Sequence, residues 1–493
     1  MTKQRTTGQI FLETWQAGRG GAAAIETNQK AHLAEIVDFA RRHSRFYAQL
    51  YRHLPDPVDD VRCLPVVTKA DLMARFEDWV TDPDIHLDDL RQFIANPEKI
   101  GQFYRGKYTV CTTSGTTGVP AVLLQDQATM NLMGALNILR SVPAWLSMQD
   151  LGRILKRGMR TAAVWATGGH YLGITMMKRQ ILEKPSRARA MRIFPVLDPL
   201  SKIVAGLNEF QPAMLNGYAS AIALLAQEQE AGRLDIHPVL TMTSSESLAM
   251  EERERIARVF AGQGFSGKVS SGKVRDNYGC SEFVAAAYGC AEGWLHVHAD
   301  WVILEPVDEN FQPVQPGETS SSVLLSNLSN RVQPVLRYNL GDRIMVRPDA
   351  CPCGSPFPAI RVEGRTDEVL HFRAENGSLV PILPLALWSV LKETPGLHRF
   401  QAIQTGERQL KLRLEADGGE TRVAWARVQE RLGSFLNRQN LAGLTLELAT
   451  EPPMRDPRSG KYRHVWSEAV TQAVGTLAQP VVFDPAGIPQ AER

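Results

Sequence analysis

Hydrophobic and polar positions alternate on two different scales along the middle of the chain. Short apolar runs at Thr161–Ala166, Ala213–Asn216 and Val239–Ser244 have the length of buried strands. Between them, Ser201–Glu209 and Ala219–Glu228 have apolar residues at helical spacing. Strands that alternate with helices in this way predict stacked α/β layers, which we expect to run from about residue 105 to residue 366.

The chain before this region has a helical pattern. Apolar residues recur at helical spacing in His32–Ala40, and Thr68 precedes another helical run as an N-cap residue. We expect residues 1–75 to form helices that pack against the α/β core, and we assign them no chemistry.

Beyond residue 366 the predicted elements are smaller. Arg399–Ile403 and Gln409–Leu414 read as the two strands of a hairpin around Gly406, and Leu444–Ala449 reads as a later strand. An amphipathic helix lies between them, and its apolar face consists of Val428, Leu432, Phe435 and Leu436. We therefore predict an α/β protein with a large multi-layer domain, residues 1–366, and a small α+β domain with an irregular tail, residues 367–493.

Composition narrows the classes of protein that fit this pattern. The 493 residues are 44% hydrophobic and 22% charged, and the net charge is only +2, which gives no indication of a nucleic-acid or membrane-surface partner. No apolar run reaches the ~18 residues of a transmembrane helix. We expect a cytoplasmic protein, in which the six cysteines are reduced thiols or metal ligands.

Thr112–Pro120 is the stretch with the most distinctive chemistry. It has five hydroxyl residues and two glycines in nine positions, between the strand-like runs Lys107–Cys111 and Pro120–Gln125. Glycine lets the backbone approach an anion, and hydroxyl and N–H groups donate to phosphate oxygens. A Walker loop is excluded because no lysine follows the second glycine. The pattern favours a phosphate-binding hairpin, although an ordinary surface hairpin has the same composition.

Two later runs combine a glycine turn with groups suited to a nucleotide. Asp276–Phe283 sets the ring of Tyr278 near the carboxylate of Glu282, which suits stacking on a base and holding magnesium beside phosphates. Leu336–Asp342 ends in an aspartate after a glycine, where a carboxylate can accept hydrogen bonds from ribose hydroxyls. Both runs also fit ordinary tight turns.

Two more polar runs lie at the predicted domain boundary and near the C-terminus. Glu363–Glu368 falls at the boundary itself. In Pro457–Arg463, Lys461 on a glycine-containing loop can place a compact positive charge beside a phosphate and a carboxylate. A lysine in an exposed basic loop is more often simply solvated.

These five runs, in this order, resemble the motifs of the adenylate-forming superfamily of acyl-CoA synthetases, peptide-synthetase adenylation domains and luciferases. Directly after the first run the chain has Ala121, where many members have lysine. The absence of that lysine is similar to the phenylacetate-CoA ligase branch. The resemblance covers nearly the whole chain. It implies a large adenylating domain and a mobile small domain that rotates about the hinge Asp367 between two half-reactions.

The resemblance also implies a role for each matching residue. Lys461, Glu282 and Thr113 are the implied catalytic residues, and Glu282 is also the implied ligand of magnesium. Tyr278 is implied to lie against adenine, and Asp342 is implied to bind ribose. The implied ATP-binding residues are Ser114, Gly115, Thr116, Thr117, Gly118, Tyr278, Gly279, Cys280, Ser281, Asp342 and Arg365.

The acyl pocket is the least defined part of the predicted site. Its candidate residues are His170, Ser245 and Asn277; the superfamily often has an aromatic residue or a histidine beside the acyl group. A single histidine is as often structural as functional. Thr241–Leu248 is bulkier and more polar than the corresponding run of the superfamily, so the size of the pocket does not follow from the resemblance.

Three cysteines and a histidine form a candidate metal site. Cys290, His296, Cys351 and Cys353 are a Cys3His set compatible with a closed, tetrahedral zinc site. Neither pair has the common zinc-finger spacing, His298 could replace His296, and a reduced cluster without metal is the alternative. Some phenylacetate-type ligases have a comparable cluster, which favours zinc. The remaining cysteines, Cys63, Cys111 and Cys280, are expected to be packing residues.

The implied activity is ATP-dependent activation of a carboxylic acid, aromatic or arylacetic, to acyl-AMP with release of pyrophosphate. The acyl group is then implied to pass to CoA as a thioester. Two alternatives remain open: an adenylase that loads a separate carrier protein or an amine, and a nucleotide-binding protein with a decayed site. A homodimer is compatible with the sequence.

Overall fold

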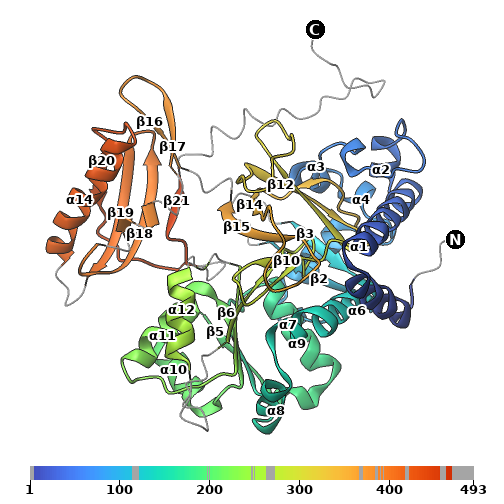
Figure 1. Cartoon of the computed structure of the whole chain (residues 1–493), viewed down its shortest axis with the longest axis horizontal. Helices are drawn as coiled ribbons and strands as arrows, with labels where there is room; N and C mark the ends of the chain where they lie inside the picture. The colour runs from blue at the N-terminus through green and yellow to red at the C-terminus, as the bar shows by residue number, and fades with distance from the viewer. Residues whose placement is uncertain are drawn as a thin grey trace. The chain divides into compact units, whose positions relative to one another are not determined.

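The computed structural model describes residues 5–113, 121–196, 198, 200–245, 248, 250–261, 273–365, 370–382, 387–388, 390–391, 394–416, 421–455 and 462–468. These residues form two compact units (Figure 1). The first unit ends at Gly364, and the second consists of Arg365–Arg455 and the described residues from Tyr462 onward.

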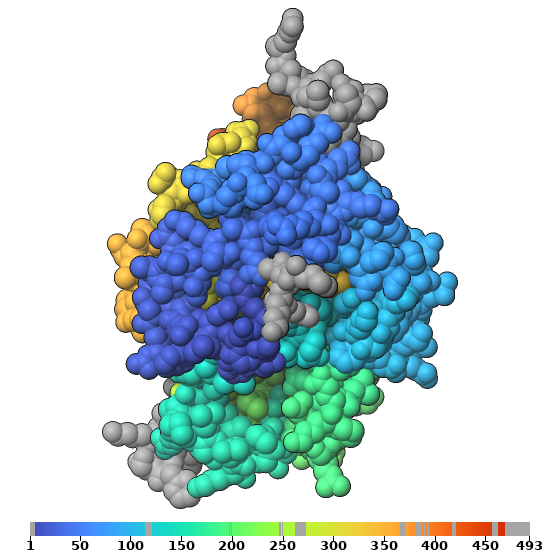
Figure 2. All heavy atoms as spheres, turned by 90° about the vertical axis from the view of Figure 1, so that its right-hand side faces the viewer, coloured from blue at the N-terminus to red at the C-terminus, as the bar shows by residue number. Residues whose placement is uncertain are grey.

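The first unit begins with helices. Their bounds are α1 (Thr7–His43), α2 (Arg45–Leu50), α3 (Lys69–Ala74), α4 (Phe76–Trp79) and α5 (Leu87–Ile94). The helix α1 buries Leu33, Ile36 and Val37, as its periodicity predicts, and α3 begins with a capping box between Thr68 and Asp71. Figure 2 shows these blue N-terminal residues covering much of one face of the unit.

A mixed sheet of nine described strands forms the centre of the first unit. The order of its strands is β14-β15-β10-β9-β8-β7-β6-β4-β5, and the neighbouring strands from β5 to β8 are parallel. Their bounds are β4 (Thr161–Trp165), β5 (Met191–Pro195), β6 (Met214–Tyr218), β7 (Leu240–Ser244), β8 (Lys273–Tyr278), β9 (Ala287–Gly289), β10 (Leu295–Val297), β14 (Asp342–Val346) and β15 (Ala359–Arg365). The three predicted strands are confirmed as β4, β6 and β7.

Helices lie on both sides of the parallel strands. Figure 1 shows α10, α11 and α12 on one side of β5 and β6, with α8 and α9 on the other. The bounds of the helices in this region are α6 (Gln127–Leu136), a π-helix η3 (Asn137–Ser141), α7 (Val142–Trp145), α8 (Met148–Lys156), α9 (Leu172–Glu183), α10 (Leu200–Phe210), α11 (Ala219–Glu230) and α12 (Met250–Val259). The two predicted helices are confirmed as α10 and α11.

Two small antiparallel sheets complete the first unit. One has the order β1-β2-β3 and the other β11-β12-β13. Their bounds are β1 (Phe103–Tyr104), β2 (Tyr108–Thr112), β3 (Val122–Gln125), β11 (Val302–Val307), β12 (Ser322–Asn327) and β13 (Tyr338–Asn339). The strands β2 and β3 pair with Thr112 opposite Val122, so the predicted hairpin around the hydroxyl-rich run is confirmed.

The second unit is a small α+β body. Its sheet has the order β20-β19-β18-β21, and a separate hairpin pairs β16 with β17. The bounds are β16 (Leu370–Arg373), β17 (Leu379–Ile382), β18 (Leu397–Gly406), β19 (Gln409–Ala416), α14 (Thr421–Arg438), β20 (Thr445–Leu448) and β21 (Val465–Ser467). The predicted apolar face of α14 is buried, which confirms the amphipathic reading. The predicted mixed α/β fold class is therefore correct. Among all the helices described, none has the length and apolar character needed to cross a membrane.

Candidate active site

Several predicted site residues lie at one edge of the central sheet. The strands β4, β6, β7 and β8 are adjacent and parallel, so their carboxyl ends meet at the same edge. Tyr278 is the last residue of β8, Ser245 directly follows β7, and His170 lies in the loop after β4. Ligands of open α/β sheets bind at this edge, because it is where the loops with variable chemistry converge.

A hydrogen bond joins the second predicted motif to the third. The hydroxyl of Tyr278 donates to Oδ2 of Asp342 over 2.7 Å, although the residues are 64 positions apart. Both side chains are buried, with exposed fractions of 9% and 8%. The aromatic ring and the carboxylate that are implied to bind adenine and ribose thus form one connected unit.

The turn after β8 is narrow enough to require glycine. A Cβ atom at Gly279 would lie 2.0 Å from the carbonyl oxygen of Val284, which no side chain can tolerate. The amide of Cys280 donates to the carbonyl of Phe283 over 3.1 Å and closes the turn. The carbonyl of Ser281 accepts from Nε2 of Gln125 at 2.9 Å. Since Gln125 ends β3, the turn is held against the hairpin that contains the hydroxyl-rich run.

Glu282 is a buried carboxyl group at the centre of this arrangement. Only 5% of the residue is exposed, and its backbone carbonyl accepts from Nδ2 of Asn327 at 2.7 Å. Burial is the largest influence on its pKa and raises it above the usual range, and the nearby carboxylate of Asp342 raises it further. Hydrogen bonds from its own backbone N–H, the Tyr338 hydroxyl and the Cys280 thiol act in the opposite direction. A cation beside this buried carboxyl would favour its ionised form and lower its pKa again.

A small cavity lies directly beside Glu282. Its polar lining residues are Lys69, Glu282 and Tyr338, and the others are Leu72, Met73, Trp79, Ala121, Leu123 and Val335. No chemistry was predicted for α3, the helix that begins at Lys69. The capping pattern at Thr68 predicted where that helix starts, but no local signal indicates what the lysine faces.

The base of the hydroxyl-rich loop is closed by Thr113. Its amide donates to the carbonyl of Ala121 over 3.1 Å, and its hydroxyl accepts from the amide of Ala121 at 2.9 Å. Arg365 is the last residue of β15, but its side chain is outside the description. The other predicted residues that lie outside the described ranges are Ser114, Gly115, Thr116, Thr117, Gly118, Asp367 and Lys461.

The three candidate pocket residues have different surroundings. His170 is buried against the ring of Phe93, at a centroid distance of 5.5 Å, and burial lowers the pKa of its imidazole. Its carbonyl accepts from the amide of Thr112 over 2.8 Å, which ties it to β2. Ser245 and Asn277 are both exposed, and Ser245 has a positive φ of 66°. The role of all three in an acyl pocket stays a prediction.

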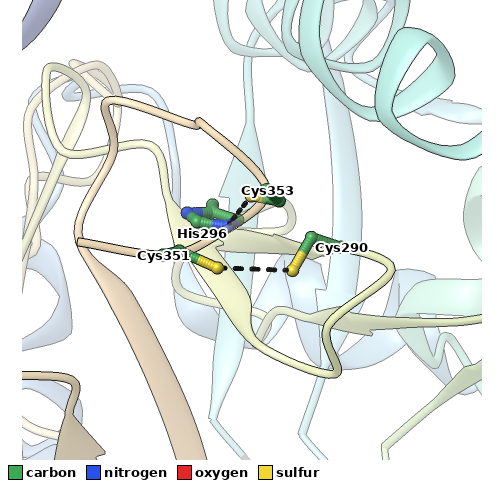
Figure 3. A group of neighbouring side chains, drawn as sticks. All are labelled: Cys290, His296, Cys351 and Cys353. Atoms are coloured by element: carbon green, nitrogen blue, oxygen red, sulfur yellow. Dashed lines mark hydrogen bonds between the residues drawn. The ribbon is translucent and has the colours of Figure 1, made fainter. Parts of the chain in front are cut away.

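The predicted metal ligands lie together. Cys290, His296, Cys351 and Cys353 offer ligand atoms that all lie within 4.8 Å of one another (Figure 3). The Sγ atoms of Cys290 and Cys351 are 3.9 Å apart, and Sγ of Cys353 is 3.1 Å from Nε2 of His296. Burial raises the pKa of the Cys353 thiol to about 12. A bound zinc ion would reverse that effect, because it takes up thiolates and releases their protons.

The surroundings of this cluster suit a closed site. Nδ1 of His296 is 3.0 Å from the carbonyl of Phe357, an arrangement that leaves Nε2 toward the sulfurs, as in many zinc sites. The amide of Gly354 donates to the backbone carbonyl of Cys351 over 3.0 Å, with Gly354 at a φ of 79°, so the turn that contains both cysteines ends in a glycine where positive φ is needed. His298 is not in the group; its Nδ1 lies 3.2 Å from Nη1 of Arg140.

The isolated cysteines have different environments. Cys111 is buried and burial raises its pKa to about 12, as expected for a packing residue. Cys63 is exposed, so its expected packing role is wrong. The reason is that it lies in a short surface 3-10 helix, Val61–Cys63, whose three residues bury no side chain.

Known proteins resemble this chain in sequence and in fold. No protein-family model matches the chain. A curated relative, the phenylacetate-coenzyme A ligase of Thermus thermophilus, is 23% identical over 474 residues, which cover 89% of this chain and 95% of the relative. A solved structure of 2-hydroxyisobutyryl-CoA ligase, in the postadenylation state in complex with 2-HIB-AMP, aligns with a TM-score of 0.61 and 20% identity over 92% of this chain and 91% of that one.

A second solved state of the same kind of enzyme is also similar. The 2-hydroxyisobutyryl-CoA ligase in complex with 2-HIB-AMP and CoA, in the thioesterification state, aligns with a TM-score of 0.53 and 20% identity over 93% of each chain. The chain has the fold of the adenylate-forming CoA ligases. The resemblance indicated by the order of the five motifs is confirmed.

Proposed function

We propose that this protein is an AMP-forming acid–thiol ligase that activates a small carboxylic acid with ATP and transfers the acyl group to CoA. In the first half-reaction, a carboxylate oxygen of the acid bonds to the α-phosphorus of ATP, and pyrophosphate leaves. In the second half-reaction, the thiol sulfur of CoA bonds to the acyl carbon, and AMP leaves. We favour an aromatic or arylacetic acid, because the curated relative is a phenylacetate-coenzyme A ligase.

The hydrogen bond between Tyr278 and Asp342 is the single observation that supports this proposal most strongly. It brings an aromatic ring and a ribose-type carboxylate acceptor together at the carboxyl edge of the parallel strands. The adjacent hairpin closes on Thr113, and its strand β3 contacts the turn that leads to Glu282. Base, sugar and phosphate groups of one nucleotide can therefore be bound by neighbouring segments of the first unit.

Glu282 suits magnesium, because Mg²⁺ in nucleotide sites binds through one or two carboxylates and the phosphates. When bound, the ion would neutralise charge on the phosphates as pyrophosphate leaves. Buried in its turn, the carboxylate would orient the nucleotide through that ion, and the neighbouring apolar residues would exclude water.

We also propose that Cys290, His296, Cys351 and Cys353 bind a structural zinc ion. Four protein ligands fill a tetrahedral shell and leave no open position for chemistry. The cluster joins the turn after β9 to the turn between β14 and β15. Zinc would therefore stabilise this edge of the central sheet.

The test of the main proposal is pyrophosphate release with a panel of aliphatic, aromatic and arylacetic acids, measured with and without CoA. We expect release that depends on the acid and a thioester product only when CoA is present. Acyl-AMP formation without any transfer to CoA would instead indicate a carrier protein or an amine as the acceptor. If no acid supports release although ATP binds, the protein is a nucleotide-binding protein without this activity.

A further inference from the structure

We propose that the face of the first unit formed by α8 and by the connection between α9 and β5 is a docking surface for a membrane that contains anionic lipids. This face consists of residues 147–160 and 182–192, and we call it the α8 face. The protein would lie on the bilayer without crossing it, with apolar side chains between the lipid headgroups and cations beside the phosphates. The inference goes beyond the proposed activity and does not depend on it.

A hydrogen bond joins the two segments of the α8 face. The amide of Thr161, which follows the first segment, donates to the carbonyl of Ala190 over 2.7 Å. Thr161 is also opposite Met191 where the parallel strands β4 and β5 begin. The face therefore lies at the edge of the central sheet where these strands begin, and Figure 1 shows α8 at the lower end of the first unit.

The helix α8 has two apolar sides, of which only one is buried. Ile154 lies in a small core cluster with Trp145 and Leu146. Met148 and Leu155 are seven positions apart and so lie on one side of the helix, but they are 83% and 62% exposed. A helix that packs on one side needs only one apolar stripe, so the packing of the unit does not explain this exposed pair.

Two more exposed apolar side chains belong to the same face. Met159 follows α8 and is 52% exposed, and Leu182 near the end of α9 is 50% exposed. Among the residues that the structure describes, eleven large apolar side chains are exposed, and four of them lie on the α8 face. Single exposed apolar residues are ordinary, whereas a group of them on adjoining segments indicates an interaction site.

The α8 face is also strongly basic. Its two segments contain eight lysines and arginines but only two acidic residues, an asymmetry that the net charge of +2 for the whole chain does not show. Both acidic residues already have partners, Asp150 in Lys273 and Glu183 in Arg179. Two of the eight cations form ion pairs with described carboxylates, Arg153 and Arg192. The other six are Lys156, Arg157, Arg160, Lys184, Arg187 and Arg189.

Three arginines at the end of α8 lie close enough to repel one another. Burial lowers the pKa of Arg157, and the charges of Arg160 and Arg153 lower it further. Nη2 of Arg157 donates to the carbonyl of Pro212 over 3.0 Å, and Nε of Arg160 donates to the carbonyl of Gln211 over 2.9 Å. The fold thus holds like charges together through neutral partners. An anionic surface would relieve the repulsion, because lysine and arginine bind lipid phosphates.

The position of the α8 face favours a lipid surface over an acidic carrier protein. A carrier protein has to bring its thiol to the acyl group, and the candidate active site lies at the opposite edge of the sheet, where the parallel strands end. A bilayer has no such requirement. It binds any face that presents exposed apolar side chains among cations, and it would leave the opposite edge of the sheet open.

The experiment measures sedimentation of the nucleotide-free protein with vesicles of phosphatidylcholine alone and of phosphatidylcholine mixed with phosphatidylserine. We expect binding only when phosphatidylserine is present, and release when NaCl is raised from about 0.1 M to about 0.5 M. The triple variant Lys156→Gln, Arg187→Gln, Arg189→Gln should bind about 100-fold more weakly, since each cation near an anionic surface raises the affinity about fivefold. Leu155→Ser should bind about 10-fold more weakly, because it removes an apolar contact with the lipids.

Matched controls make the same changes on other surfaces. The variant Lys30→Gln, Arg42→Gln, Arg91→Gln removes three cations whose side chains are 59%, 64% and 58% exposed. Leu12→Ser replaces an apolar side chain that is 52% exposed. Both controls should bind phosphatidylserine vesicles as the wild type does.

Several outcomes would overturn the inference. Wild-type protein that does not bind phosphatidylserine vesicles refutes it, and so does equal binding to both kinds of vesicle. An equal loss of binding in the charge control would show that total charge, and not the α8 face, attracts the lipid. Binding to polyglutamate but not to vesicles would assign the face to an acidic protein instead. No variant changes a residue of the candidate active site, so a failure of the proposed function leaves this test readable.

Discussion

Removal of the Tyr278 hydroxyl tests the hydrogen bond between the two motifs that are predicted to bind the nucleotide. Tyr278→Phe keeps the buried ring, and therefore its packing and its capacity to stack on a base. It removes the 2.7 Å hydrogen bond to the buried Asp342 carboxylate. Loss of one hydrogen bond to a buried carboxylate costs about 1–3 kcal/mol, so we expect the free energy of unfolding of the nucleotide-free protein to fall by about that amount.

The same substitution should weaken ATP binding through the sugar. Without the tyrosine hydroxyl, the Asp342 carboxylate loses one of the contacts that orient it, and its hydrogen bonds to the ribose become less favourable. A loss of about 1.5–3 kcal/mol, the range for a hydrogen bond to a charged group, corresponds to about a 10- to 150-fold higher dissociation constant for ATP. Denaturant titration measures the stability, and calorimetric titration measures the affinity.

A nucleotide without ribose hydroxyls provides the control. With 2′,3′-dideoxy-ATP, wild type and Tyr278→Phe should bind alike, because neither protein can use Asp342 on the sugar. If the substitution weakens both nucleotides equally, the hydroxyl acts on packing or on the base, and our reasoning is wrong. Unchanged affinity for ATP together with unchanged stability would show that the hydrogen bond has no energetic role.

Four further predictions concern the remaining groups. Because burial raises the pKa of Glu282 above its ordinary value of 4.5, the protonated carboxyl favours the folded state, and wild-type stability should fall as the pH rises through the folded pKa. Glu282→Gln should lack this fall in denaturant titrations between pH 4 and pH 8, and it should lose magnesium-dependent pyrophosphate exchange. If the stability of the variant depends on pH in the same way as that of the wild type, the predicted effect of Glu282 on stability is wrong. Cys353→Ser should lower both the zinc content and the melting temperature. The control Cys63→Ser, at an exposed cysteine outside the cluster, should change neither. A wild-type protein that is stable and contains no zinc by elemental analysis would refute the metal site. Lys461→Ala should abolish acyl-AMP formation but leave thioester formation from added acyl-AMP, as quenched-flow assays can measure, and a wild-type adenylation rate would exclude its catalytic role. Asp367→Pro, which restricts φ at the proposed hinge, should spare pyrophosphate exchange and reduce thioester formation, whereas an equal loss of both would assign it a structural role.

Local patterns in the sequence were sufficient for the elements that depend on neighbouring residues. The strands β4, β6 and β7, the hairpin of β2 with β3, the cap at Thr68 and the buried face of α14 all follow from periodicity and capping. These features are predictable because each is determined by residues a few positions apart. The order of the five motifs likewise indicated the fold, since such motifs are short runs that can be read one at a time.

The tertiary structure decided which distant residues meet. Nothing local to Tyr278 indicates a hydrogen bond to Asp342, and nothing local to Lys69 indicates a cavity shared with Glu282. The choice of His296 over His298 was likewise open in the sequence. It is decided because β10 pairs antiparallel with β15, with His296 opposite Ala359, near the turn that contains Cys351. Contacts of this kind depend on the order and register of strands, which are set by the packing of the whole unit and not by the spacing of residues along the chain.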